Sequence, residues 1–325
     1  MANVLVVGGA GYVGGALTDQ LTETGHALRV YDSLVYEEYY RKPVEFVLGD
    51  VRDWDRLGPH LDWADVVVWL AALVGDGACS LDKELTKTIN TGCVALLAER
   101  FRGRILFMST CSVYGASDGL LDETSAVNPL SIYAETKLAS EKILLGRNAM
   151  MFRLGTLFGV GDTYSRIRMD LVVNVLTAKA FQYGRISVFG GDQYRPLLHV
   201  KDVATAIVQN IETDHTGIYN LHAVNVRITD LADQLREHFP QLEISRTDVK
   251  FQDNRNYRVT SDRAVSAFGF HPTHTVEDGI RELKTLFEQG RIRKIGLLRQ
   301  SNHRFLKELL ETPSSPLGFE VRPSL

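Results

Sequence analysis

The stretch Val4-Leu-Val-Val-Gly8-Gly-Ala-Gly11-Tyr-Val-Gly14 joins a short apolar run to three glycines spaced three residues apart. Such a run predicts a buried strand, and the glycines after it predict a tight turn that opens into a helix. In this arrangement Gly8 permits the turn, Gly11 lets the backbone approach a pyrophosphate, and Gly14 lets the helix pack close to the strand. Because the first amides of that helix can bind phosphate oxygens, the stretch predicts a dinucleotide site.

The first half of the chain alternates short apolar runs with helical patterns. Apolar runs of this length predict strands buried on both faces, and their alternation with helices predicts a parallel sheet covered on each side. We therefore expect an α/β fold with a Rossmann-type, doubly wound parallel sheet. The predicted strands cover residues 4–7, 27–31, 44–47, 66–70 and 105–108, and the helical patterns cover residues 17–21 and 85–97.

The pattern changes beyond Gly159, which predicts a smaller C-terminal α/β domain that binds the substrate. Thr275 and Asp278 have the spacing of a capping box at a helix start. We expect a dinucleotide-binding domain at 1–160, a substrate-binding domain at 161–290 and an extension at 291–325, with segments near 185–210 returning to the first domain. Helices are predicted at 169–183, 203–211, 228–239 and 276–287, and a strand at 186–189.

Composition narrows the class of protein. The 325 residues are 45% hydrophobic and 23% charged, which suits roughly two globular domains. A net charge of -4 gives no basic field, so neither nucleic acid nor a membrane surface is an expected partner. The longest apolar run, residues 66–74, is well short of the roughly 18 residues of a spanning helix.

Cysteine usage points to a reducing compartment. Cys79, Cys93 and Cys111 are odd in number and widely spaced, so they predict neither a disulfide framework nor a metal site. The N-terminus enters a predicted strand without the charged segment that opens a secretory signal. A cytoplasmic location is therefore expected.

Asp32 ends the second predicted strand, 18 residues after Gly14. A carboxylate at this point binds the adenosine ribose hydroxyls in dinucleotide-binding folds. The same carboxylate would repel a 2′-phosphate, which favours NAD over NADP. The alternative is a simple turn aspartate.

A second signal comes from Tyr133 and Lys137, which are one helical turn apart and so share a helix face. Tyr133 can take the proton of a secondary alcohol if a nearby cation lowers its pKa, and the Lys137 ammonium can be that cation. Thr110 follows the predicted strand at 105–108, at the sheet edge where α/β proteins bind ligands. Such a tyrosine and lysine are common on exposed helices, but with the glycine turn they predict a nicotinamide-dependent redox site.

From residue 2 to about 290 the chain resembles the extended short-chain dehydrogenases/reductases, in the nucleotide-sugar epimerase/dehydratase family. The resemblance implies NAD as cofactor and a homodimer, and it aligns Thr110 with the catalytic Ser/Thr that hydrogen-bonds the reacting oxygen. It also places Asp50 and Val51 against adenine, Leu70-Ala71-Ala72 beside the ribose, and Asn90 on the nicotinamide side. The full set of expected cofactor residues is Gly8, Gly11, Tyr12, Val13, Gly14, Asp32, Asp50, Val51, Leu70, Ala71, Ala72, Asn90, Tyr133 and Lys137.

The same resemblance implies substrate contacts in the second half. Arg195 and Arg255 align with arginines that bind the substrate diphosphate, a role that suits a planar, permanently charged guanidinium. Arg166 and Arg168 precede the helix predicted from Met169 and can either meet phosphate at its start or remain solvated. His199 is expected to order backbone beside the site rather than to act as a base.

Three positions depart from the family pattern. Cys111 and Ser112 follow Thr110 where the sugar 4,6-dehydratases carry an acid and a base, which argues against dehydration. Both are expected near the substrate. Cys111 can act as an acid in an epimerisation through an enolate, but the usual role of a cysteine favours a small buried packing residue. Thr156 replaces a carboxamide that usually contacts substrate. Together with the run at 70–75, the segment at 153–159 resembles a subgroup that includes enzymes acting on GDP-heptose.

The expected function is NAD-dependent oxidation or reduction at C4 of a GDP-, UDP- or dTDP-linked sugar. A 4-epimerase and a 4-dehydrogenase/reductase both fit, and a 4,6-dehydratase or a non-catalytic NAD sensor are the alternatives. Nothing in the residues separates the first two outcomes. The extension at 291–325 is basic between Arg291 and Arg299. It can form a helix that covers the site, pack on a second subunit, or remain a solvated surface.

Overall fold

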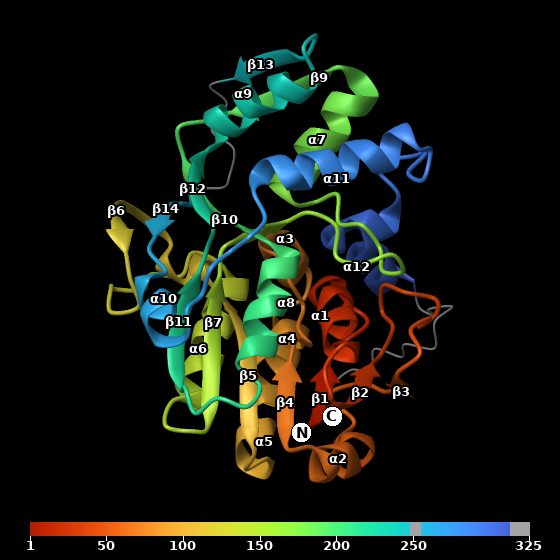
Figure 1. Cartoon of the computed structure of the whole chain (residues 1–325), viewed down its shortest axis with the longest axis vertical. Helices are drawn as coiled ribbons and strands as arrows, with labels where there is room; N and C mark the ends of the chain where they lie inside the picture. Colours follow the sequence, from red (N-terminus) through yellow and green to blue (C-terminus); the bar gives the residue numbers. More distant parts are fainter. Residues whose placement is uncertain (248–254, 313–325) are drawn as a thin grey trace.

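A seven-stranded parallel sheet forms the centre of the structure, a computed structural model that describes residues 1–247 and 255–312 (Figure 1). Its strand order is β11-β7-β5-β4-β1-β2-β3, and every neighbouring pair is parallel. The predicted Rossmann-type sheet is therefore confirmed. The strands are β1 (Asn3–Val7), β2 (Ala27–Asp32), β3 (Glu45–Leu48), β4 (Val66–Trp69), β5 (Arg104–Thr110), β7 (Ala149–Leu154) and β11 (Gly217–Leu221).

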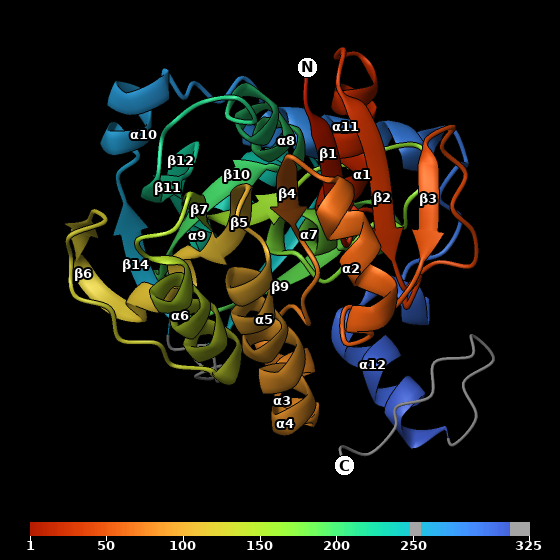
Figure 2. The same cartoon turned by 90° about the horizontal axis from the view of Figure 1, so that it is seen from below.

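Helices cover both faces of this sheet (Figure 2). Alternate residues of β1 explain why: Val4 and Val6 pack into one hydrophobic core, while Leu5 and Val7 pack into another. The first core contains α1 (Tyr12–Thr22) and α8 (Val200–Gln209). The second contains α2 (Trp54–Trp63), α5 (Cys93–Arg100) and the end of α6 (Ile132–Leu144).

The helical pattern predicted at 85–97 is interrupted in the structure. It divides into α4 (Lys83–Lys87), a π-helical turn η1 (Thr88–Gly92) and the start of α5, after a short α3 (Asp76–Leu81). π-Turns of this kind add a residue to a helix and often mark functional regions. Here the turn buries Asn90 towards α6, where its amide donates to the Thr136 hydroxyl at 3.2 Å.

Small sheets lie near the carboxyl ends of the main strands (Figure 1), and they combine strands after residue 180 with two earlier strands, at 116–121 and 156–158. A hydrophobic core joins α7 (Val172–Tyr183), α9 (Ile228–His238) and α11 (Val276–Glu288) to two of these sheets. The sheets are β8 (Thr156–Phe158) with β10 (Tyr194–His199) and β12 (Val224–Arg227), β9 (Arg185–Phe189) with β13 (Glu243–Thr247), and β6 (Ala116–Leu121) with β14 (Asn256–Val259). The remaining elements are η2 (Cys111–Tyr114), α10 (Asp262–Phe268), η3 (Leu298–Gln300) and α12 (Asn302–Glu311).

Two helix boundaries test the sequence predictions here. The capping box of Thr275 and Asp278 at the start of α11 is confirmed. The start of α7 at Met169 is wrong, because the helix begins at Val172. The Met169 amide instead donates to the carbonyl of Gln300 at 2.9 Å, which ties this residue to the C-terminal extension in a bend before the helix.

Segments near 185–210 were expected to return to the first domain, and in the structure this return begins with α8 at Val200. Both β9 and β10 belong to the small sheets, whereas α8 packs on α1 and β11 joins β7 at the edge of the main sheet. The division at residue 160 stays a prediction. Along the described residues, no helix combines the length and the apolar character that crossing a membrane requires.

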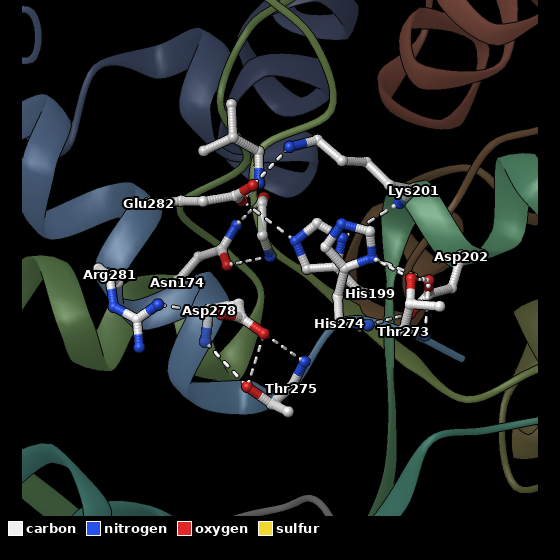
Figure 3. Close-up of polar contacts among 12 residues, drawn as sticks. Asn174, His199, Lys201, Asp202, Thr273, His274, Thr275, Asp278, Arg281 and Glu282 are labelled. Carbon is white, nitrogen blue, oxygen red and sulfur yellow. Dashed lines mark hydrogen bonds and ion pairs between the residues drawn. The ribbon is translucent and has the colours of Figure 1, made fainter. Parts of the chain in front are cut away.

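A polar network fastens α8 and α11 to the loop after β8 (Figure 3). His199 is buried, and its Nδ1 accepts from the Lys201 amide at 3.2 Å, which assigns the ring proton to Nε2. That Nε2 then donates to Glu282 at 3.1 Å, and Glu282 also accepts from the Val160 amide at 2.9 Å. His199 thus orders backbone beside the cleft, as the sequence suggests.

A second histidine extends this network (Figure 3). The His274 ring stacks on His199 with centroids 4.4 Å apart, and its Nδ1 lies 2.8 Å from Asp202. The Glu282 carboxylate pairs with the Lys201 ammonium at 2.5 Å. Although burial raises the pKa of Glu282, hydrogen bonds from His199, Lys201 and Val160 lower it to about 2. The carboxylate is therefore ionised at neutral pH and holds the two parts of the fold together.

Candidate active site

A cleft of about 1730 Å³ runs along the carboxyl ends of the main strands. Single-ligand pockets are typically about 300–1,000 Å³, so this one has room for two molecules. The structure brings most of the predicted site residues to its wall: Gly8, Gly11, Tyr12, Val13, Gly14, Asp32, Asp50, Val51, Leu70, Ala71, Ala72, Thr110, Ser112, Tyr133, Lys137, Thr156, Arg166, Arg168, Arg195 and Arg255.

The glycine turn leaves no space for side chains at two of its positions. Gly8 has a φ of +88°, and a Cβ on it would lie 2.5 Å from the amide nitrogen of Ala71. A Cβ on Gly14 would overlap the carbonyl of Gly9. The turn and the first turn of α1 can therefore pack this closely only with glycine at both positions.

The start of α1 has the properties of an anion site. No side chain caps Gly11, and the first turn of the 11-residue helix carries no acidic residue. Its free amides face the cleft with the positive end of the helix dipole behind them. The hydroxyl of Tyr12 donates to the carbonyl of Gly159 at 2.7 Å, which ties the turn to the loop after β8. This cradle fits the pyrophosphate of a dinucleotide.

Two carboxylates flank the adenosine side. Asp32 at the end of β2 accepts from the amides of Ala10 at 3.0 Å and Leu34 at 2.7 Å, and burial raises the pKa of its carboxyl group. Asp50 is held by Arg52, whose guanidinium lies 2.6 Å away. Both line the cleft, so a negatively charged 2′-phosphate would meet two acids there.

The predicted catalytic residues all line the cleft. Thr110 is the last residue of β5, and Tyr133 and Lys137 come from the first turns of α6. The Ser131 hydroxyl accepts from the Ala134 amide and caps α6, which fixes where its first turn begins. Within the protein, Lys137 Nζ donates to the carbonyl of Met108 at 2.7 Å.

The electrostatics of this group differ from the sequence expectation. Burial raises the pKa of the Tyr133 phenol above its usual range, and the neighbouring Cys79 and Asp76 add to the rise. Arg168 and a hydrogen bond with Thr110 act in the opposite direction. The expected lowering by Lys137 is therefore not found in the protein alone, since its ammonium is directed to Met108. Burial lowers the pKa of Lys137 itself to about 8.

A buried ion pair fixes α6 against the sheet. The Arg153 guanidinium of β7 binds Glu141 of α6 through two hydrogen bonds of 2.9 and 2.7 Å. The Ser109 hydroxyl donates to the same carboxylate at 2.5 Å, and all three side chains are buried. Bidentate pairs of this kind hold a fixed geometry, so the helix that carries the tyrosine and lysine cannot slide along the sheet.

At the other end of the cleft, charged groups from distant segments converge. Arg255 Nη1 lies 3.0 Å from Asp76 and donates to the Ser112 hydroxyl at 3.4 Å. Asp76 also accepts from Ser131 at 2.7 Å. Arg195 on β10 donates to the carbonyl of Arg255, so the two predicted diphosphate arginines lie side by side. Asn254, which precedes Arg255 in a stretch that resembles a diphosphate-binding segment of the family, lies outside the described residues.

Asp76 was not among the predicted residues. It follows the run at 70–75 by one position and opens α3, after a Gly75 with a φ of +100°. A polar residue in the loop after a predicted parallel strand is the signal that could have found it. Its partners come from the loops before α6 and β14, and no local pattern links those segments.

Two predicted residues do not reach the cleft. Cys111 is fully buried with its thiol donating to the carbonyl of Arg153 at 3.2 Å, so its assignment to substrate binding is corrected to packing. Burial raises the pKa of this thiol. Asn90 is buried behind the wall, where its amide pairs with the backbone of Leu73 at 2.8 and 3.0 Å. It supports the loop after β4 rather than touching the cavity.

Arg166 and Arg168, the two arginines before α7, already have polar partners within the protein. Arg168 pairs with Asp170 at 2.9 Å. Arg166 donates to Asn302 and to the carbonyl of Arg299 at 2.7 Å, and burial lowers its pKa to about 10. The expectation that either residue sits at the start of a helix is wrong, because α7 begins only at Val172.

Residues 4–221 match the model of the NAD dependent epimerase/dehydratase family. The chain belongs to this family. It is therefore an enzyme with NAD as cofactor, and the glycine cradle and the acidic adenosine side fit that cofactor. Bound nicotinamide supplies a hydride acceptor and donor.

Relatives within the family differ in activity. A UDP-glucose 4-epimerase of Rhizobium meliloti is 34% identical over 306 residues, which cover 84% of this chain and 93% of the relative. UDP-glucuronic acid decarboxylase 1 of Danio rerio is 24% identical and covers 93% of this chain and 75% of its own length. The structure of MoeE5 in complex with UDP-glucose and NAD has a TM-score of 0.77 and 22% identity, over 89% of this chain and all of that one. The structural likeness establishes the fold.

Proposed function

We propose that this enzyme oxidises and reduces C4 of a nucleotide-diphosphate sugar, as a 4-epimerase or as a 4-dehydrogenase/reductase. The observation that carries the proposal is the meeting of Thr110, Tyr133 and Lys137 in a single cleft with the glycine cradle. The similarity to a UDP-glucose 4-epimerase at 34% identity supports the choice of carbon.

Each of these residues has a role that follows from its chemistry. Tyr133 takes the proton of the sugar hydroxyl at its phenolic oxygen and returns it in the reverse step. Thr110 hydrogen-bonds that oxygen and orients it. Lys137, protonated below a pKa of about 8, stabilises the phenolate once the phenol has lost its proton.

Two arginines support a diphosphate-linked substrate. Arg195 and Arg255 lie at the end of the cleft beyond Tyr133, where their guanidinium groups suit phosphate oxygens. Thr156 and Ser112 line the wall beside them and offer hydroxyl groups to a sugar. The sugar can be linked to GDP, UDP or dTDP, and a GDP-heptose stays within this proposal.

The structure of the segment after Thr110 disfavours a 4,6-dehydratase. Such a reaction needs an acid and a base next to the threonine, and this chain has a buried thiol at Cys111 and a hydroxyl at Ser112. Ser112 interacts with the Tyr257 hydroxyl at 3.3 Å and with Arg255. Neither position offers a group that exchanges protons readily at neutral pH.

The test is turnover of GDP-, UDP- and dTDP-sugars by the purified enzyme, with and without a 2-oxo acid as external hydride acceptor. Tyr133→Phe removes the proton acceptor and is expected to lower kcat by about 100-fold or more while NAD stays bound. Product formation without the 2-oxo acid supports an epimerase, and dependence on it supports a dehydrogenase.

If no sugar changes the redox state of bound NAD, and Tyr133→Phe alters nothing, the proposal is wrong and the result favours the alternative of an NAD sensor. The homodimer and the cytoplasmic location expected from sequence stay predictions, which gel filtration with light scattering and cell fractionation test.

A further inference from the structure

The extension after residue 290 returns to the cofactor side of the cleft. Ser301, Asn302, His303 and Leu306 form part of the cleft wall together with the glycine turn. The short η3 and the helix α12 lead the chain there, and α12 packs on α3 (Figure 1). Of the arrangements that the sequence left open for this segment, the structure shows contact with the cleft.

Asn302 links three segments of the cleft. Its side-chain amide donates to the carbonyl of Val74 at 2.9 Å, and its backbone amide donates to Asp170 at 2.9 Å. Its side-chain oxygen accepts from Arg166. Asn302 is only 4% exposed. A buried asparagine that satisfies its side chain on two loops fixes their positions, because leaving such a group unpaired is costly.

Aromatic and charged contacts attach the same segment to the loop after β2. Tyr36 lies against Phe305 with ring centroids 5.3 Å apart, and the Arg166 guanidinium lies 4.0 Å from the Tyr36 ring centroid. Arg299 pairs with Glu38 at 2.6 Å. The loop begins at Ser33, directly after Asp32, so the extension covers the adenosine side.

Apolar packing holds α12 in place. Leu306 and Leu309 are buried with Leu73 and Cys79 in one hydrophobic cluster, against which Tyr133 also packs. Detaching α12 would expose these leucines to water, which is unfavourable because it returns buried apolar surface to the solvent. The segment is therefore a packed part of the site.

We propose that residues 298–311 are the outer wall of the NAD site, and that Asn302 is the positioning residue that fastens this wall. The three loops that Asn302 and its neighbours connect are those that follow β2, β4 and β8, and all three line the dinucleotide half of the cleft. NAD enters and leaves when the wall detaches. This inference depends on the cofactor alone and not on which sugar reacts.

The experiment measures NAD dissociation from the full-length protein without any sugar, by trapping released NAD with an auxiliary dehydrogenase. Asn302→Ala removes the hydrogen bonds to Val74 and Arg166 and is expected to accelerate dissociation by about tenfold. Lys307→Ala is the matched control: Lys307 is exposed on the same helix, and its side chain is not among those that line the cleft, so the rate is expected to stay unchanged. Asn302→Asp keeps the acceptor for Arg166 and is expected to fall between them.

Hydrogen exchange of the native chain provides an independent readout if Asn302→Ala does not fold. Backbone amides of α12 are expected to exchange more slowly with NAD bound than without it. An unchanged dissociation rate in folded Asn302→Ala, or exchange of α12 that ignores NAD, overturns the proposal. A failure of the sugar reaction would leave both measurements untouched, so the two proposals are tested separately.

Discussion

The two halves of the cleft are built in different ways. In the dinucleotide half, the glycine turn positions backbone amides, and contacts between backbones leave no space for a Cβ at Gly8 or Gly14. In the substrate half, Asp76, Arg195 and Arg255 hold one another through side chains and carbonyls from distant loops. Steric exclusion among a few neighbouring residues determines the shape of the dinucleotide half. Charge pairs between segments that are far apart in the chain determine the shape of the substrate half.

This difference explains how a single family can keep one cofactor and vary its substrates. A steric arrangement tolerates almost no substitution, whereas a set of paired side chains can be exchanged a few at a time. Three substitutions sharpen the contrast. They address the backbone cradle, the network that joins the two parts of the fold, and the charged end of the cleft.

The largest effect is expected from Gly14→Ala in the cradle. The new Cβ would overlap the Gly9 carbonyl, so the turn or α1 must shift. We expect the free energy of unfolding to fall by about 3 kcal/mol and NAD binding to be lost. Urea unfolding and NAD titration measure both. Gly92→Ala is the control: it has helical φ and ψ, and the nearest atom within 4 Å is 3.8 Å away. Equal stability of Gly14→Ala and wild type would refute the steric account.

An intermediate effect is expected from Glu282→Gln in the network of Figure 3. The folded pKa of about 2 lies below the ordinary 4.5, so the carboxylate stabilises the fold above pH 4.5 and loses this contribution as the pH falls towards 2. We expect Glu282→Gln to be about 2 kcal/mol less stable at pH 7 and to approach wild type in acid. Thermal unfolding across pH tests this.

The control for that experiment is Glu277→Gln on the same helix. Glu277 is exposed and pairs with Arg281, which is equally exposed, so little change is expected. A stability difference between wild type and Glu282→Gln that does not depend on pH would mean that packing, and not the carboxylate charge, joins the two parts.

The smallest effect is expected from Asp76→Asn at the charged end. The Asp76 carboxylate raises the pKa of Tyr133, so its neutralisation lowers that pKa and moves the acidic limb of the kcat profile to lower pH. At pH 7 we expect a gain in kcat of about threefold. Glu84→Gln, an exposed carboxylate on α4, is the control. A profile that moves to higher pH would contradict the electrostatic role of Asp76.

The dinucleotide half could be predicted from sequence because its determinants are local. The glycine spacing, Asp32 at a strand end, and Tyr133 with Lys137 on one helix turn each depend on a few neighbouring residues. The parallel sheet followed from apolar runs in the same way. Two strands of the sheet, β7 and β11, were missed. The run at 149–154 contains Arg153, and the run at 217–221 carries tyrosine and asparagine and lies more than 60 residues from its partner β7.

The rest depends on contacts between segments that are far apart in the chain. The partners of Asp76 are Ser131 and Arg255, 55 residues and more away, and those of Asn302 lie at Val74, Arg166 and Asp170. The burial of Cys111 is likewise a property of the assembled core. The direction of the Tyr133 pKa was missed because desolvation needs the complete cavity wall.

Two buried cysteines, Cys79 and Cys93, can report on local opening of the hydrophobic core. Burial raises the pKa of Cys79 and Cys93 to about 12, so almost no thiolate is present in the native state, and a thiol-specific dye can react only after a local opening. Cys79 packs in the same hydrophobic cluster as Leu306 and Leu309 of α12. Cys93 is the first residue of α5 and belongs to the core between that helix and the main sheet. The modification rate of Cys79 therefore measures how often α12 detaches, and the modification rate of Cys93 measures how often the core beside the central sheet opens.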